Sequence, residues 1–258
     1  MSFQEQSIRT EICGLFFGGI LGLLPVLANA EPSTSPPDPA FQQAVEQVVE
    51  QYIRAHPEVI EQTLQALQAK REAEERERVR NLIATKQTEL LNDPNSPVSG
   101  NLEGDVTVVE FFDYRCGYCK RVAGAVTQLQ KDDPNVRVVY KDFPILGEAS
   151  ELAARAALAS KTQGKHLAFH EALLASKHEL TRETVFMIAG EIGLDTERLN
   201  RDMQAPPIQA TIERNRTLAR ELGINGTPGF IVGTELVPGA LDLNDLKNLV
   251  GRVRKEKS

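Results

Sequence analysis

Cysteine is scarce in this sequence: its 258 residues include three, and two of them, Cys116 and Cys119, stand three positions apart. The third, Cys13, lies near the N-terminus, and none of the four histidines is close in sequence to the pair. A structural zinc site needs about four cysteine or histidine ligands. The scarcity therefore makes zinc a weak explanation of the pair, and we expect no metal or other cofactor.

The chain also lacks an excess of basic residues, since its formal net charge is −7 and its pI is about 5.3. A nucleic-acid-binding protein needs a concentrated positive surface, so we expect no nucleic-acid partner. A chain of 258 residues with 41% hydrophobic and 25% charged residues is typical of a globular protein. Its length allows one medium domain with a smaller element, or two domains.

Residues 12–27 lack charge altogether and form an apolar run. A small-any-small sequence ending at Ala30 follows, and then a proline-rich stretch at 31–39. This order predicts a secretory signal peptide over residues 1–30 and a linker over 31–39. An uncleaved membrane anchor is the alternative, although the run is short for spanning. Cleavage after Ala30 would remove Cys13 and move the protein out of the reducing cytosol, so that disulfide chemistry becomes available.

Residues 40–91 contain no glycine and one proline, Pro57, and we expect helices on both sides of it. After residue 67 the segment is charged nearly all round and cannot bury a face. Its first part carries an apolar stripe, which could pack on the downstream domain or on another copy of the chain. We favour oligomerisation through residues 40–91. The stripe comprises Phe41, Val45, Val48, Val49, Tyr52, Ile53, Val59, Ile60, Leu64 and Leu67.

From residue 106 the pattern indicates an α/β fold. Residues 106–112 form a nearly continuous β-favouring run, which predicts a strand buried on both faces. A helix over about 117–131 and a second strand near 136–144 follow, so the two strands should be parallel. Several helices are expected over 148–222, and then two short strands and a final helix.

The cysteine pair stands where the first strand ends and its helix begins. Unpartnered N–H groups and the helix dipole would stabilise a thiolate at Cys116, and Arg115, Lys120 and Arg121 could add positive charge if they point toward the sulfur. Cys119 lies one helical turn further on. This arrangement suits thiol–disulfide exchange, with Cys116 as nucleophile and Cys119 as resolving thiol. A purely structural disulfide is a weaker reading, because so small a loop gains little entropy.

Two further features accompany the pair. Glu110 interrupts an otherwise apolar strand, and if it faces inward, burial would raise its pKa and let it exchange protons with Cys119; an outward or edge position is the alternative. Pro228 stands just before a strand, where it could hold a cis bond. We assign no function to the histidines, including His166 and His170, which are one helical turn apart without a third ligand in view.

The sequence VVEFFDYRCGYCKR (108–121), the loop GTPGF (226–230) and the helical insert between them resemble the periplasmic DsbA-like thiol–disulfide oxidoreductases. The resemblance covers residues 95–254. Residues 52–67, YIRAHPEVIEQTLQAL, are similar to the N-terminal region of the ScsC-like (suppressor of copper sensitivity) branch, in which such helices are an oligomerisation stalk. The resemblance implies a thioredoxin fold with an inserted helical domain at about 148–222, preceded by a helical stalk, and a periplasmic location.

The resemblance also implies roles for individual residues. Cys116 and Cys119 match the redox pair, and Glu110 matches the family's buried acid. Thr227 and Pro228 match the cis-proline loop, which lies against the active site and offers backbone hydrogen bonds to substrate. Between the cysteines, Tyr118 replaces the histidine of the best-known DsbA pattern, and we expect the Tyr118 side chain to contact the substrate. Since a phenol cannot stabilise a thiolate as an imidazolium does, we hypothesise a weaker oxidant.

These expectations lead to an extracytoplasmic protein thiol–disulfide oxidoreductase, with isomerase or reductase activity favoured over oxidation. An oligomer can present several sites around one misfolded substrate, and it can hide its thiols from an oxidising membrane partner. Cysteine-containing secreted proteins, a membrane redox partner and further copies of the chain are the expected partners. The alternatives are a donor of disulfides to secreted proteins, and a copper-binding or chaperone-like module, since copper(I) favours thiolates.

Overall fold

The computed structural model describes residues 38–257, and its centre is a five-stranded sheet in the order β1-β3-β2-β4-β5. The strands are β1 (Val98–Gly100), β2 (Val106–Phe112), β3 (Val136–Asp142), β4 (Gly229–Val232) and β5 (Glu235–Pro238). β2 and β3 run parallel, as expected, and the other three neighbouring pairs are antiparallel. The α/β fold class is confirmed; the short strand β1 was not predicted.

Both faces of β2 are covered, because its residues alternate between two hydrophobic clusters. On one face Val106, Val108 and Phe112 pack with α4 (Gly117–Asp132) and α10 (Leu243–Lys257). On the other face Val109 and Phe111 pack with α9 (Pro206–Glu221). By this alternation Glu110 lies on the α4 face.

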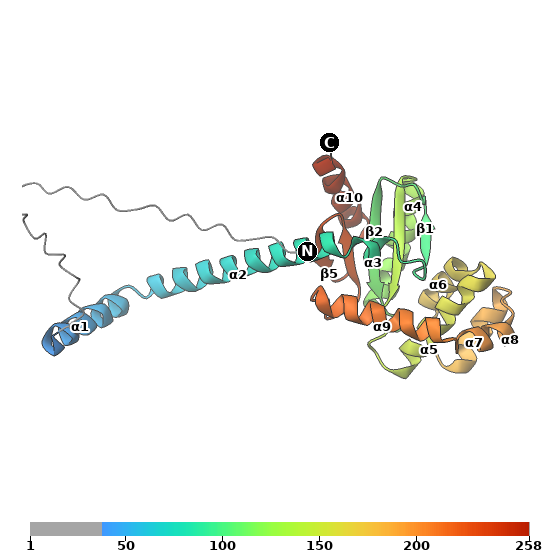
Figure 1. The fold of residues 1–258 in the computed structure, drawn as a ribbon, viewed down its shortest axis with the longest axis horizontal. Coiled ribbons are helices and arrows are strands. Elements are labelled where there is room, and N and C mark those ends of the chain that lie inside the picture. Colours follow the sequence, from blue (N-terminus) through green and yellow to red (C-terminus); the bar gives the residue numbers. More distant parts are fainter. Residues whose placement is uncertain (1–37, 258) are drawn as a thin grey trace, which may run out of the picture. The chain divides into compact units, whose positions relative to one another are not determined.

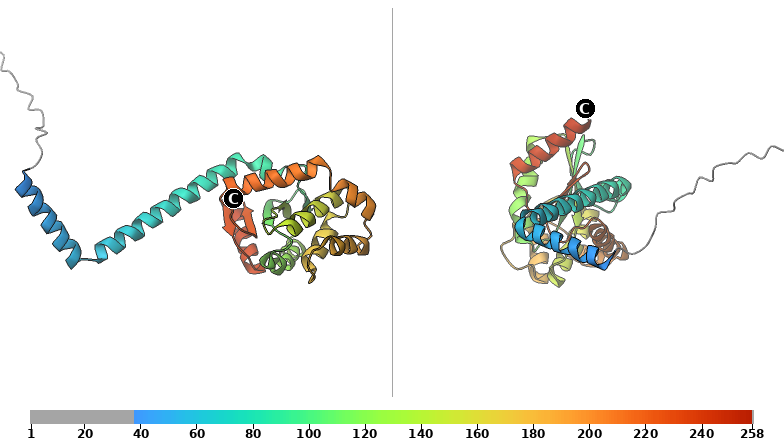
Figure 2. Two further views of the ribbon diagram at one scale, coloured as in Figure 1. Left: turned by 90° about the horizontal axis from the view of Figure 1, so that it is seen from below. Right: turned by 90° about the vertical axis from the view of Figure 1, so that its left-hand side faces the viewer.

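The segment of the chain between β3 and β4 is mostly helical. It comprises α5 (Glu148–Ser160), a 3-10 turn (Lys161–Gln163), α6 (His166–Ala175), α7 (Arg182–Glu191), α8 (Thr196–Asp202) and α9. Alanine side chains of α5 are buried, which allows neighbouring helices to approach closely. Figure 1 shows α5–α8 gathered beside the sheet, and Figures 1 and 2 show α9 leading back from them toward the strands.

Among the described residues, three helices precede the sheet: α1 (Pro39–Ala55), α2 (Glu58–Thr85) and α3 (Gln87–Leu91). The chain divides into two compact units, the first ending at Gln62 and the second beginning at Thr63. α1 starts with Pro39, which we expected in the linker, and Asp38 caps it by accepting the N–H of Ala40 at 3.0 Å.

The end of α2 belongs to the core of the second unit. Val79 and Ile83 of α2, together with Leu90 of α3, are buried against β2 and α9. The expected domain start at residue 95 therefore leaves out three core residues. In the first unit, by contrast, α1 buries none of its residues.

Within residues 38–257 no helix has both the length and the apolar character that crossing a bilayer requires. The expected signal peptide (1–30) and all but the last two residues of the expected linker lie outside the described residues.

The buried end of α2 can be tested with Ile83→Ala. Ile83 is 2% exposed, so we expect the variant to lose about 3 kcal/mol of unfolding free energy through lost burial and a residual cavity. Chemical denaturation would measure it, with Leu102→Ala, at a 67% exposed position, as the control that loses less than about 0.5 kcal/mol. Equal stability of the two variants would contradict the assignment of this helix end to the core.

Candidate active site

Cys116 is the N-cap of α4 and the link between strand and helix. Its Sγ–H donates a hydrogen bond to the backbone carbonyl of Thr227 at 3.2 Å, and its own carbonyl accepts the N–H of Lys120 at 3.1 Å. The residue is 7% exposed, because the Thr227 loop lies against the sulfur. Access to this thiol is thus narrow and is shaped by a segment from the other end of the domain.

Cys119 follows one turn later and is fully buried. Burial raises the pKa of its thiol well above the ordinary range, the charges of Cys116 and Glu110 act in the same direction, and a hydrogen bond from the Asp113 backbone opposes them. Both cysteines are in the reduced form. A more accessible thiol therefore stands one helical turn from a buried, protonated one.

Glu110 is buried on the α4 face of the sheet, so the outward alternative is wrong. Loss of hydration raises the pKa of its carboxyl to about 8. Within the described part of the chain, its Oε1 has no hydrogen-bond partner. A carboxyl group of this kind, electrostatically coupled to Cys119, can hold or release a proton near neutral pH.

The loop opposite Cys116 contains a cis peptide bond between Thr227 and Pro228. β4 begins at the next residue, and its antiparallel pairing sets Gly229 against Phe111 and Phe230 against Glu110. This register carries Thr227 to the end of β2, beside Cys116. The sheet thereby joins two segments that are about 110 residues apart in the chain.

Tyr118 is 59% exposed, and the Arg121 guanidinium lies 4.1 Å from the centre of its ring. Arg115 donates to the carbonyl of Leu146 at 2.5 Å, and Lys120 donates to the carbonyl of Ser176 at 2.6 Å. The three cations thus have partners other than the sulfur. Of the positive groups that we considered for Cys116, only the N-terminus of α4 therefore lies at its sulfur.

Two of the four histidines, to which we assigned no function from the sequence, form part of the core. His166 and His170 are buried, and burial lowers the pKa of His166 to about 3 and that of His170 well below its usual value. His170 Nδ1 and the Tyr114 hydroxyl are hydrogen-bonded at 3.1 Å, and Phe112 and Tyr140 surround the pair. A neutral polar link therefore joins α6 to the segment before Cys116.

Asp113 is the residue that the sequence analysis missed. Its buried carboxylate accepts hydrogen bonds from the N–H groups of Arg115, Ile145 and Leu146, and from the Ser150 hydroxyl. Its position between a buried strand and the cysteine pair could have indicated that Asp113 is part of the site. Three of its four partners, Ile145, Leu146 and Ser150, lie more than 30 residues further along the chain, so the local sequence did not reveal them.

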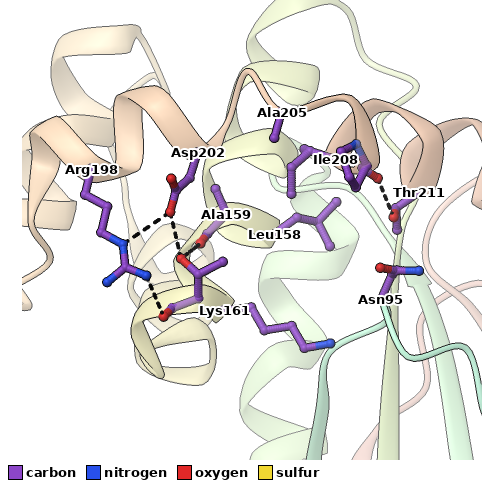
Figure 3. A pocket seen from close by; sticks show the side chains of 11 residues that line it. Asn95, Leu158, Ala159, Lys161, Arg198, Asp202, Ala205, Ile208 and Thr211 are labelled. Atoms are coloured by element: carbon purple, nitrogen blue, oxygen red, sulfur yellow. Dashed lines mark hydrogen bonds and ion pairs between the residues drawn. The ribbon is translucent and has the colours of Figure 1, made fainter.

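A pocket of about 610 Å³ lies in the helical insert, away from every expected site residue (Figure 3). Leu158 and Ile208 form its apolar floor. The charged groups at its edge already have partners. Arg198 lies 3.4 Å from Asp202, which also accepts the Thr162 hydroxyl at 2.8 Å, and Lys161 donates to the Pro94 carbonyl. It contributes nothing to the cysteine site.

A dithiol at a strand–helix junction, with a cis-proline loop against it at the end of a central sheet, defines a thioredoxin-fold protein. The family model described as DSBA-like thioredoxin domain matches residues 107–251, and the chain belongs to this family. Residues 42–74 match a second model, the copper resistance protein ScsC N-terminal domain.

Solved structures that are similar to this chain support the family assignment. A thioredoxin-like oxidoreductase from Silicibacter pomeroyi DSS-3 is 54% identical, with 66% of this chain and 98% of that chain covered and a TM-score of 0.65. Proteus mirabilis ScsC in a compact conformation is 29% identical, with 83% and 98% covered and a TM-score of 0.64.

Among curated proteins, the Na(+)/H(+) antiporter NhaA of Herminiimonas arsenicoxydans is 30% identical over 146 residues. These residues are 56% of this chain and 23% of the antiporter. The chain thus spans about a quarter of the length of the antiporters it matches.

The raised pKa of Glu110 predicts a pH-dependent stability difference. The folded state keeps this carboxyl protonated up to about pH 8, whereas the unfolded chain releases the proton near its usual pKa of 4.5. The folded state therefore binds more protons over this window, so Glu110 costs stability as the pH rises through it. Glu110→Gln should gain about 3 kcal/mol relative to the parent chain between pH 5 and pH 8.

Urea unfolding of both proteins at several pH values measures this gain, and Glu103→Gln, at an exposed position, is the matched control. A gain that does not change with pH would show that Glu110 is ionised throughout.

Proposed function

We propose that this chain is a protein thiol–disulfide oxidoreductase with Cys116 and Cys119 as its redox pair. The observation that carries the proposal is the contact of the Cys116 sulfur with the cis-proline loop at the N-terminus of α4, while Cys119 is held one turn behind it. The predicted signal peptide supports a periplasmic location for this reaction.

In the reductive direction, the Cys116 thiolate attacks one sulfur of a substrate disulfide. A mixed disulfide forms and the other substrate sulfur leaves as a thiolate. Cys119 then loses its proton and attacks Cys116 Sγ, which closes the Cys116–Cys119 disulfide and releases the second substrate thiolate. Two electrons pass from the pair to the substrate, and a membrane-bound dithiol donor must return them. In the oxidative direction each step reverses.

Glu110 is the group we assign to the proton of Cys119. The thiol is buried and strongly favours its neutral form, so it needs a nearby acceptor when it attacks. Glu110 is the carboxylate whose charge is coupled to it, and with a pKa of about 8 it is partly ionised at neutral pH.

The cis-proline loop and Tyr118 are the proposed substrate contacts. The Thr227 carbonyl now accepts the thiol of Cys116, and the loop's backbone stands where it can pair with an extended substrate segment. Tyr118, exposed between the two cysteines, can lie against that segment. Since a phenol does not stabilise the thiolate by charge, we propose a weaker oxidant than proteins with histidine there.

Isomerisation or reduction is the direction we favour, because of the first unit of the chain. The apolar side chains of α1 are exposed, as with Val48 at 66% and Tyr52 at 55%. Because the apolar stripe of α1 is not buried against its own chain, it can pack against the same helix of a second copy. Several active sites on one oligomer can act in turn on a single misfolded protein, which suits shuffling more than one-way oxidation.

The division of labour between the cysteines predicts a trapping experiment. Cys119→Ser should accumulate a mixed disulfide between Cys116 and a scrambled substrate protein, because the resolving thiol is gone. Cys116→Ser should trap nothing and lose at least about a thousandfold in rate, because the buried Cys119 cannot replace it.

Non-reducing electrophoresis and mass spectrometry of the adduct would identify the cysteine involved. An adduct at residue 119 in the Cys116→Ser variant, at the parental rate, would reverse the assignment. Stoichiometric copper(I) binding without any exchange activity would favour the copper-handling alternative.

The stalk proposal can be tested by charging α1. Val48→Lys with Tyr52→Lys should dissociate the oligomer in analytical ultracentrifugation and should abolish refolding of a scrambled protein, while insulin reduction persists. Gln43→Lys with Gln47→Lys adds the same charge to the opposite helix face and is the matched control. A monomeric parent chain, or equal shuffling by both variants, would remove the stalk argument and favour a plain oxidase.

A further inference from the structure

A short span of the chain carries the backbone of the cis-proline loop between two fixed points. At its start, Ile224 is buried and donates its N–H to a carbonyl of α9 at 2.8 Å. At its end, the Pro228 carbonyl accepts the N–H of Gly239 at 2.8 Å. Between these points, the Thr227 carbonyl accepts the Cys116 thiol at 3.2 Å. A change in the length of the span therefore moves the group that contacts the nucleophile.

Asn225 and Gly226 begin this span, and they form the one Asn-Gly step in the sequence. Both residues are exposed and border a hollow of about 190 Å³. Within residues 38–257, neither the Asn225 side chain nor the Gly226 N–H forms a hydrogen bond. A β-carbon placed on Gly226 would meet no atom within 4 Å. The side-chain amide and the following backbone nitrogen can therefore approach each other.

This arrangement permits deamidation of the asparagine. The Gly226 nitrogen attacks Cγ of Asn225 and a new C–N bond forms; the N–H proton passes through solvent to the side-chain nitrogen, which leaves as ammonia. Water then opens the five-membered succinimide at either carbonyl and gives aspartate or isoaspartate, so that no oxidant or reductant is needed. Glycine favours the attack, because it has no side chain and its backbone is permissive, and asparagine is a thermolabile residue.

The two products have different effects on the site. Aspartate adds one negative charge at an exposed position, where solvent and salt screen it from the Cys116 sulfur. In isoaspartate the main chain runs through the former side chain, so the span gains one carbon atom, about 1.5 Å. Since both ends of the span are fixed, the extra length would displace the Thr227 carbonyl from the sulfur.

We propose that Asn225 is a deamidation site and that its conversion to isoaspartate slows thiol–disulfide exchange at Cys116 by displacing the Thr227 carbonyl. The inference rests on the proposed function and adds to it a loss of activity that grows with the age of the molecule. A misplacement of about 1 Å at a reacting centre costs on the order of a hundredfold in rate. One screened charge costs far less, so the geometric change determines the outcome.

The test ages the reduced full-length chain in warm, mildly alkaline buffer that contains a thiol reductant. Mass spectrometry of the proteolytic peptide around Asn225 detects deamidation, and labelling by L-isoaspartyl methyltransferase measures the isoaspartate. Stopped-flow exchange with a peptide disulfide gives the rate before and after ageing. We expect isoaspartate at residue 225, and a rate at least about tenfold lower in the fraction that contains it. Asn95, exposed but with its side chain donating to Asp93 at 3.1 Å, is the internal reference and should stay an amide.

Gly226→Ala is the matched control. Its methyl group meets no neighbouring atom and the residue has no positive φ, yet the methyl group hinders attack by the residue 226 nitrogen. Compared with its own unaged sample, this variant should keep its rate under conditions that inactivate the parent chain. Asn225→Asp carries the charge alone and should be slower than the unaged parent by no more than about threefold.

Repair separates isoaspartate from other damage. Treating the aged parent with the methyltransferase and S-adenosylmethionine converts isoaspartate to aspartate and should restore the rate to that of Asn225→Asp. An unaged parent that exchanges no disulfide refutes the proposed function itself. An active parent whose Asn225 stays an amide, or an aged Gly226→Ala that loses as much rate as the parent, overturns the deamidation site. Isoaspartate with an unchanged rate, or an Asn225→Asp rate as low as that of the aged parent, overturns the geometric effect.

Discussion

The pairing of β2 with β3 on one edge and β4 on the other is the constraint on which the site depends. β2 is buried on both faces and is fixed in register by its two neighbours. That register sets the position of Glu110 within the sheet and of Asp113 and Cys116 beyond its end, and it brings Thr227 against the sulfur. A slip of one residue would turn Glu110 to the opposite face and would separate the nucleophile from the cis-proline loop.

Much of this could be predicted from local pattern, and the remainder failed for identifiable reasons. The strand over 106–112, the helix after it and the place of Cys116 between them follow from periodicity and from a short motif. The burial of Cys116 does not, because it depends on Thr227, which lies far along the chain. Val79 and Ile83 were assigned to a solvated rod, because two apolar residues one turn apart barely disturb a highly charged pattern. The partners of Arg115, Lys120 and Arg121 depend on side-chain directions that only the folded domain defines.

The electrostatics of Glu110 and Cys119 favour one ionised group in this pair at a time. Burial disfavours the charged forms of both Glu110 and Cys119, and each anion would raise the pKa of the other. A proton that leaves the thiol is therefore best received by the carboxylate, so that the total buried charge does not change. The neighbouring Tyr114–His170 link adds no charge, because burial keeps the imidazole neutral. The helix N-terminus at Cys116 acts in a buried interior that also holds the Asp113 carboxylate, where charges are weakly screened.

Among the exposed apolar side chains of residues 38–257, those of the loop before α5 and those of α1 have different consequences. Ile145 and Leu146 are held by backbone hydrogen bonds to Asp113, so their exposure depends only on contacts within the second unit. The stripe on α1 belongs to the first unit and contributes nothing to the core of the second. Chemistry and substrate contact can therefore reside in one unit, and the number of sites brought together can be set by the other. On the proposed assembly through α1, a change in α1 alters how many disulfides are rearranged per encounter while each thiol keeps its own reactivity, and this separation would distinguish a shuffling enzyme from a simple donor of disulfides.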